Sequence, residues 1–98
     1  MTETPQRTPT HPGAILREDV LPALGVTKAE LARTLGISRR ALYDLLEERG
    51  AVTPHMALRL ERVCGGTAET WVGLYDRHAL HRLRTQSEDP GATVSADR

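Results

Sequence analysis

The sequence predicts an all-α fold, a compact domain of five helices, and two observations lead to that class. Apolar residues in the middle of the chain recur at spacings of three and four, the period of a helix that packs on one face. No stretch alternates apolar and polar residues with an enrichment in β-branched types, so strands are not expected. Because 98 residues suffice for a single core, we expect one domain between two tails.

The two ends of the chain differ from its middle in composition. Residues 1–10 are rich in threonine and proline, and residues 85–98 carry no apolar stripe that could be buried. Because neither end can offset its ordering entropy by burial, we expect disordered tails on either side of a domain at 11–84.

Composition also excludes several classes of protein. Apolar runs are pairs and triplets, far short of the roughly 20 residues that span a bilayer. The first residues lack the basic start and the apolar stretch of a secretory signal. The single cysteine, Cys64, cannot form an internal disulfide. We therefore expect a cytoplasmic protein with no membrane partner.

The type of the basic residues is more informative than the net charge of the chain. The chain has 13 basic and 13 acidic residues, and this formal net charge of zero predicts no nucleic-acid partner by itself. Every cation except Lys28 is an arginine, whose planar fork suits phosphates and guanine edges. A codon bias of the genome would explain the excess of arginine equally well.

The first two helices are bounded by residues that favour helix ends. Pro12 suits the opening position of the first helix, and Pro22 and Gly25 are expected to end it. Thr27 and Glu30 form a capping box at the start of the second helix. The apolar residues of the two helices are Ile15, Leu16, Val20, Leu31, Ala32 and Leu35.

The other three helices follow the same pattern. Ser38 is a good N-cap for a third helix that runs through Leu46, and Thr53 caps a fourth, which two glycines end. A fifth helix is expected at about 68–83. The inward apolar residues are Leu42, Leu45 and Leu46 in the third helix, and Met56, Leu60, Val63 and Cys64 in the fourth.

The second and third helices are separated by too few residues to lie antiparallel. A turn of three residues, 36–38, forces them to cross steeply, which is the geometry of a helix-turn-helix. Ala32 is small enough to let the third helix approach, and Gly36 supplies the positive φ that stops the second helix. Ile37 is expected to be buried beneath the turn. The spacing therefore predicts a DNA-binding motif.

The third helix is expected to turn its polar residues outward. Arg39 and Arg40 lie in its first turn, the end that enters the major groove in such motifs. Cations there oppose the helix dipole at a cost of about 0.3–1 kcal/mol, so a purely structural reason for them is weak. Lys28, at the start of the preceding helix, would lie along the DNA backbone. The outward residues are Ser38, Arg39, Arg40, Tyr43, Asp44 and Glu47.

Four short motifs carry a family resemblance. They are His11-Pro12-Gly13 with Ile15-Leu16, Glu30-Leu31-Ala32, Leu35-Gly36-Ile37-Ser38-Arg39, and Thr53-Pro54 with Met56-Ala57-Leu58-Arg59-Leu60. Together they resemble the HigA-type antitoxins of the xenobiotic-response-element-like class of helix-turn-helix repressors. The resemblance covers residues 11 to about 84. Its more specific parts are the first and last motifs, the latter followed by Trp71.

The resemblance implies a lambda-repressor-like homodimer that binds double-stranded operator DNA and represses its own operon. It further implies a cognate toxin as partner, a RelE-like mRNA endonuclease that this protein would neutralise. The positions carried over as DNA-binding are Lys28 at phosphate, Ser38, Arg39, Arg40 and Tyr43 at the groove, and Arg49 in the loop that follows.

The loop after the third helix departs from the family pattern. The family usually has Asn-Gly and then basic residues after the position of Leu46, whereas this chain has Glu47 and Glu48. Only Arg49 is therefore carried over from the loop. Two acids near DNA phosphates would weaken binding, so we expect them to act as a brake on DNA affinity.

The fifth helix has more apolar residues than one small core needs. We expect its surplus apolar surface to form a dimer interface, with scattered exposed leucines as the alternative. The expected interface residues are Trp71, Val72, Tyr75, Leu80 and Leu83.

Other functions have weaker support in the sequence. His78 and His81 share a helix, but a structural zinc site needs four ligands, and Cys64 is far away in sequence. No catalytic arrangement or phosphate loop is present, so neither an enzyme nor a cofactor is expected. The alternatives kept open are a stand-alone repressor without a toxin and a protein-interaction module that has lost DNA binding.

Overall fold

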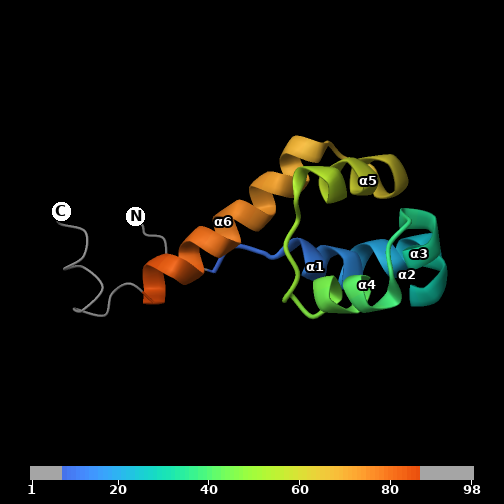
Figure 1. Ribbon diagram of the computed structural model, residues 1–98, viewed down its shortest axis with the longest axis horizontal. Helices are drawn as coiled ribbons and strands as arrows, with labels where there is room; N and C mark the ends of the chain where they lie inside the picture. The colour runs from blue at the N-terminus through green and yellow to red at the C-terminus, as the bar shows by residue number, and fades with distance from the viewer. Residues whose placement is uncertain (1–7, 87–98) are drawn as a thin grey trace.

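The computed structural model describes residues 8–86, and over that range the protein is built from helices without strands (Figure 1). The helices are α1 (Pro12–Ile15), η1 (Leu16–Val20), α2 (Leu21–Leu24), α3 (Lys28–Leu35), α4 (Arg39–Leu46), α5 (Pro54–Cys64) and α6 (Ala68–Gln86). The first three follow one another without a break in the helical backbone, so they form one helix. The expected five-helix, all-α fold is confirmed.

The first helix contains one turn of π-helix, η1, in which the N–H of Leu21 bonds to the carbonyl of Leu16. Pro22 was expected to end this helix, and that expectation is wrong, because the helix continues through Leu24. Pro22 lies in the first turn of α2, directly after the wider π-turn, where a missing N–H and the proline ring are tolerated. The helix ends at Gly25, whose φ is 67°.

The expected N-caps are confirmed. The Thr27 hydroxyl accepts from the N–H of Glu30 at 3.0 Å, and the Glu30 carboxylate accepts from the N–H of Thr27 at 2.9 Å. The Ser38 hydroxyl accepts from the N–H of Ala41 at 3.0 Å, and α5 begins with the same kind of bond. Side chains thus satisfy helix N–H groups that would otherwise lack a partner.

One core joins the five helices. Its buried apolar members are Leu16, Leu31, Ala32, Leu35, Leu42, Leu45, Leu46, Val52, Ala57, Leu60 and Trp71. Helix α6 contributes only Trp71 to this set, and its C-terminal half extends beyond the other helices (Figure 1). The core therefore fixes α3 and α4 firmly and leaves the end of α6 projecting.

Helix α6 runs through Gln86, so the domain boundary expected at 84 falls inside a helix. The remainder of the expected tails, residues 1–7 and 87–98, lies outside the described residues. Within residues 8–86, no helix has both the length and the apolar character needed to cross a membrane.

Candidate nucleic-acid interface

The turn between α3 and α4 is built as the sequence predicts. Gly36 has a φ of 77°, and its N–H bonds to the carbonyls of Ala32 and Arg33 at 2.9 and 3.1 Å. The N–H of Ile37 also bonds to the carbonyl of Ala32, at 3.0 Å. Ile37 is half-buried beneath the turn. These bonds close α3 within a single turn and redirect the chain, so that α4 leaves in a new direction (Figure 1).

The packing of α3 and α4 decides which side chains face outward. Ala32 is 2% exposed, and Leu42 and Leu45 of α4 are buried in the core. Arg39 and Arg40 are exposed in the first turn of α4. The expectation that these two arginines face away from the core is confirmed.

The structure brings Lys28 and Tyr43 together from different helices. The Lys28 ammonium lies 5.5 Å from the centroid of the Tyr43 ring, and the tyrosine is 45% exposed. This cation–π contact places the start of α3 beside the outer face of α4. Ser38 is exposed at the start of α4, and because its oxygen only accepts in the cap bond from Ala41, its hydroxyl proton is still available to a ligand.

Arginines and acids form ion pairs along α4 and in the loop that follows it. Asp44 lies 3.7 Å from the Arg40 guanidinium and 3.4 Å from that of Arg49. A second acid, Glu47, lies 4.0 Å from Arg49. Exposed pairs of this kind contribute little to stability, about 0–1 kcal/mol, so a phosphate could replace the carboxylates at small cost.

The two acids of the loop are not equivalent. Glu48 has a left-handed φ of 63°, and its carboxylate is 3.2 Å from the guanidinium of Arg17. Arg17 also contacts Glu18 at 3.0 Å and donates to the carbonyl of Leu46 at 2.6 Å. The carboxylates of Glu18 and Glu48 raise the pKa of Arg17. Glu48 is therefore turned toward the first helix, whereas Glu47 is exposed.

Arg17 and Arg59 were missed as contributors to this site. Arg17 holds the last carbonyl of α4, and Arg59 donates to the carbonyl of Leu35 at the end of α3, at 2.8 Å. The carbonyls that they bind lie 29 and 24 residues away in sequence. No local spacing rule connects them.

His11 caps the first helix. Its Nδ1 accepts from the N–H of Gly13 at 2.8 Å, and its Nε2 lies 3.2 Å from the carbonyl oxygen of Gly50. The ring packs edge-on against His78 and Tyr75, with centroids 4.9 and 5.8 Å apart. Burial, and then the neighbouring His78, lower the pKa of His11. Among the described residues, no cluster of His, Cys, Asp or Glu is suited to a metal ion.

The residues expected at a dimer interface differ in exposure, and Val72 and Tyr75 are half-buried. Trp71 is 5% exposed, and its indole N–H donates to the carbonyl of Gly65 at 2.9 Å, so its ring belongs to the core. Leu80 and Leu83 are 45% and 57% exposed. The expectation that Trp71 supplies interface surface is therefore corrected, because the small core needs its largest side chain.

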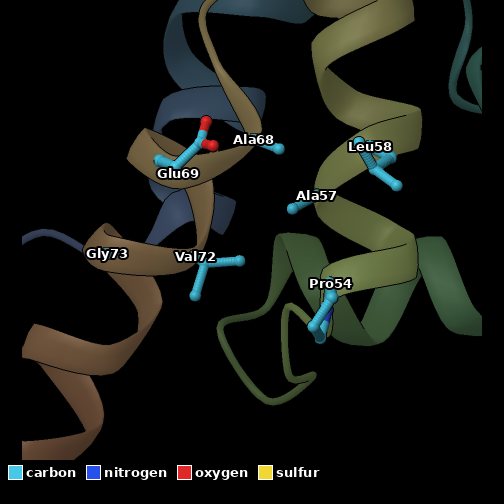
Figure 2. Close-up of a pocket in the computed structure, with 7 residues that line it drawn as sticks. All are labelled: Pro54, Ala57, Leu58, Ala68, Glu69, Val72 and Gly73. Carbon is cyan, nitrogen blue, oxygen red and sulfur yellow. The ribbon is translucent and has the colours of Figure 1, made fainter.

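A hollow of about 420 Å³ is lined by residues of α5 and of the N-terminal half of α6. Figure 2 shows Ala57 and Val72 facing one another across it. The hollow is lined by Pro54, Ala57, Leu58, Ala68, Glu69, Val72 and Gly73. Further along α6, a second hollow of about 240 Å³ is lined by Tyr75, Ala79, Arg82, Leu83 and Gln86. One side of α6 thus presents apolar surface along most of its length.

Comparison with known proteins places this geometry in a family. A family model described as helix-turn-helix matches residues 16–72, more than half of the chain. Virulence-associated protein I of Dichelobacter nodosus is 36% identical over 70 residues, a match that covers 71% of this chain. The match spans 65% of that relative, just under two thirds of its length.

Solved structures are similar over nearly the whole chain. Antitoxin GraA has a TM-score of 0.82 at 34% identity, covering 95% of this chain and 98% of that one. The same antitoxin in complex with its operator has a TM-score of 0.78 at 34% identity, with 100% and 96% covered. Pseudomonas aeruginosa antitoxin HigA, solved with the higBA promoter, has a TM-score of 0.73 at 30% identity, with 92% and 95% covered. The chain therefore belongs to the helix-turn-helix family, and it is similar in structure to the antitoxins GraA and HigA. None of these relatives is named as an enzyme.

Proposed function

We propose that this protein is an antitoxin that binds the operator of its own operon through α4, the recognition helix. The observation that carries the proposal is the exposed first turn of α4, where Arg39 and Arg40 extend from the positive end of a helix. Two cations at that end are unfavourable in the free protein, and binding of an anion or a guanine edge beside them stabilises them. GraA with its operator and HigA with the higBA promoter support this assignment by similarity.

The contacts divide between positioning and reading. Lys28 and Arg49 flank the recognition helix and would bind phosphates, which fix the register but carry no sequence information. Arg39, Arg40, Tyr43 and Ser38 would face the major groove, where arginine pairs with guanine through two hydrogen bonds. Exposure of all these side chains is consistent with the division.

The operator-bound form would be a homodimer. One short helix reads only a few base pairs, whereas two copies about 34–36 Å apart reach successive major grooves. The apolar side of α6 supports this, with Val72, Tyr75, Leu80 and Leu83 as the interface and Leu58 of α5 beside it. Trp71 is left out because it is buried in the core.

The protein partner would be a cognate toxin, a RelE-like mRNA endonuclease encoded beside this gene, and both would act in the cytoplasm. Two relatives named as antitoxins, GraA and HigA, support a toxin partner. A second candidate function is a protein-interaction module without DNA binding. The exposed carboxylate of Glu47, next to the proposed DNA surface, favours that alternative.

A binding assay on the DNA upstream of the gene tests the proposal. Arg39→Ala and Arg40→Ala should each cost about 1–3 kcal/mol of operator affinity where the arginine contacts a base. Lys28→Ala should weaken binding to the operator and to a scrambled duplex equally and reduce the salt slope by about one.

Unchanged operator affinity in the Arg39→Ala, Arg40→Ala double variant would refute the assigned surface. A wild type that prefers neither duplex would favour the interaction module. Adding the protein encoded by the neighbouring gene to this assay tests whether that protein is the cognate toxin.

A further inference from the structure

We propose that Arg59 of α5 is a positioning residue for the recognition helix, because it holds the turn from which α4 begins. This inference rests on the DNA-binding function proposed above. Arg59 adds to that function a residue that would set operator affinity without contacting DNA.

The contact joins two helices that do not follow one another. Nη1 of Arg59 donates to the carbonyl of Leu35 at 2.8 Å and lies 3.4 Å from the carbonyl of Gly36. Leu35 is the last residue of α3, and Gly36 is its left-handed cap. The guanidinium therefore sits over the turn of the helix-turn-helix, and it comes from the helix that also packs against α6.

The turn needs this kind of partner. The carbonyls in the last turn of a helix receive no hydrogen bond from an N–H of the same helix, and they lie at the negative end of the helix dipole. A planar guanidinium can serve two neighbouring carbonyls at once and adds a favourable charge. Gly36 leaves room for it, since a Cβ built at that residue would lie 2.6 Å from Nη1 of Arg59.

The consequence for DNA reading follows from the short distance along the chain. Ser38, the N-cap of α4, comes two residues after the carbonyl of Gly36, and Arg39 follows directly. A turn free to shift would change the angle at which Arg39 and Arg40 enter a groove. Base contacts with two hydrogen bonds lose strength quickly when they are misaligned, whereas phosphate contacts are more tolerant. Arg59 should therefore affect specific binding more than non-specific binding.

The test compares two duplexes of equal length, the DNA upstream of the gene and a scrambled version, over a series of salt concentrations. Arg59→Met removes the donors and keeps an apolar stem, and Arg62→Met is the matched control, an exposed arginine on the same helix. We expect Arg59→Met to lower affinity for the upstream duplex between about twofold and thirtyfold. Its affinity for the scrambled duplex and its salt slope should match those of Arg62→Met.

Arg59→Lys supplies a second variant that keeps the charge. Its side chain is one bond shorter and lacks the planar fork, so it should bind scrambled DNA like wild type and still lose part of the operator affinity. Hydrogen exchange without DNA gives an independent readout. The amides of Gly36 and Ile37 should exchange faster in Arg59→Met than in Arg62→Met, with the amides of α6 unchanged.

Each opposing result has a distinct meaning. Equal losses on both duplexes with a salt slope reduced by about one would show that Arg59 binds phosphate, and the inference would be wrong. Unchanged affinities and unchanged exchange at Gly36 and Ile37 would show that the turn holds its shape without Arg59. A wild type that does not distinguish the two duplexes would refute the proposed function. In that case, the exchange of the turn amides still decides whether Arg59 fixes the turn.

Discussion

Helices α3 and α4 differ from α6 in how they use their apolar residues. Within two helices of eight residues each, α3 and α4 bury six apolar side chains and leave polar ones outside. Helix α6 has 19 residues and buries only Trp71 and His78, while Leu80 and Leu83 stay exposed. The difference indicates that the first pair is completed by the protein's own core, whereas α6 has apolar surface to offer a second protein.

The largest effect should come from placing charges on the projecting part of α6. Leu80→Glu with Leu83→Glu should give a monomer that keeps its helical content, because both side chains are about half exposed. Operator affinity should fall about a hundredfold or more, since the second recognition helix is no longer held near the first. Light scattering, circular dichroism and the duplex assay measure the three quantities.

Leu24→Glu is the matched control for that variant. Leu24 is 45% exposed, like Leu80, but lies at the end of the first helix. It should leave the mass and the operator affinity unchanged. A double variant that remains dimeric would move the interface to the hollow between α5 and α6, where Leu58→Glu is the next substitution to measure. If the wild type were monomeric at tens of micromolar, the proposed homodimer would be refuted.

Trp71 sharpens the comparison from the other side, because it belongs to α6 and yet serves the core. Trp71→Ala should cost about 3–5 kcal/mol of unfolding free energy, as for other large buried side chains. Trp71→Phe keeps most of the ring and should cost about 1 kcal/mol through the lost bond to Gly65. Urea unfolding gives both values. If Trp71→Phe became monomeric at wild-type stability, the ring would belong to the interface.

The same contrast explains how much of the molecule the sequence could predict. The capping box at Thr27, the cap at Ser38 and the glycine at Gly36 are local signals, and each bounds a helix of the DNA-binding unit. The exposed position of Arg39 then follows from helical period. Contacts between distant segments have no such signal, which is why Arg17 and Arg59 could not be found.

Two further expectations, for Trp71 and Pro22, were wrong because each sequence pattern is compatible with more than one structure. Trp71 fits both a core and an interface stripe on α6, and only packing decides between them. Pro22 usually ends a helix, but a π-turn just before it lets the helix continue.

His11 joins the first helix to α6, since its side chain caps the first helix and its ring packs on His78 of α6. Its pKa is lowered from 6.5 in the folded protein. At a pH between the lowered pKa and 6.5, the unfolded chain therefore binds a proton that the folded chain does not. The unfolding free energy should therefore fall as the pH drops through 6.5 and level off below the folded pKa. The groups facing the ring are His78, Tyr75 and Arg82 of α6, and Glu48 of the loop.

Urea unfolding from about pH 8 to about pH 5 measures this dependence. His11→Asn is the matched variant, because an asparagine oxygen can still cap the helix without titrating in this range. It should lose less stability on acidification than wild type. Identical pH profiles for the two proteins would assign the effect to groups other than His11.

The smallest effect should separate the two acids that follow α4. Glu47 is exposed beside Arg49, whereas Glu48 is paired with Arg17 and turned toward the first helix. Glu47→Gln should strengthen binding to a random duplex by about two- to fivefold at low salt, because it removes a charge that repels phosphate, and less at high salt. Glu48→Gln should change DNA affinity less and instead lower stability by under about 1 kcal/mol, through the loss of its partial pairing with Arg17. Fluorescence anisotropy at two salt concentrations and urea unfolding distinguish the two variants. Equal gains in DNA affinity would mean that Glu48 faces the DNA as much as Glu47 does, and no gain in either would place the whole loop away from the phosphates.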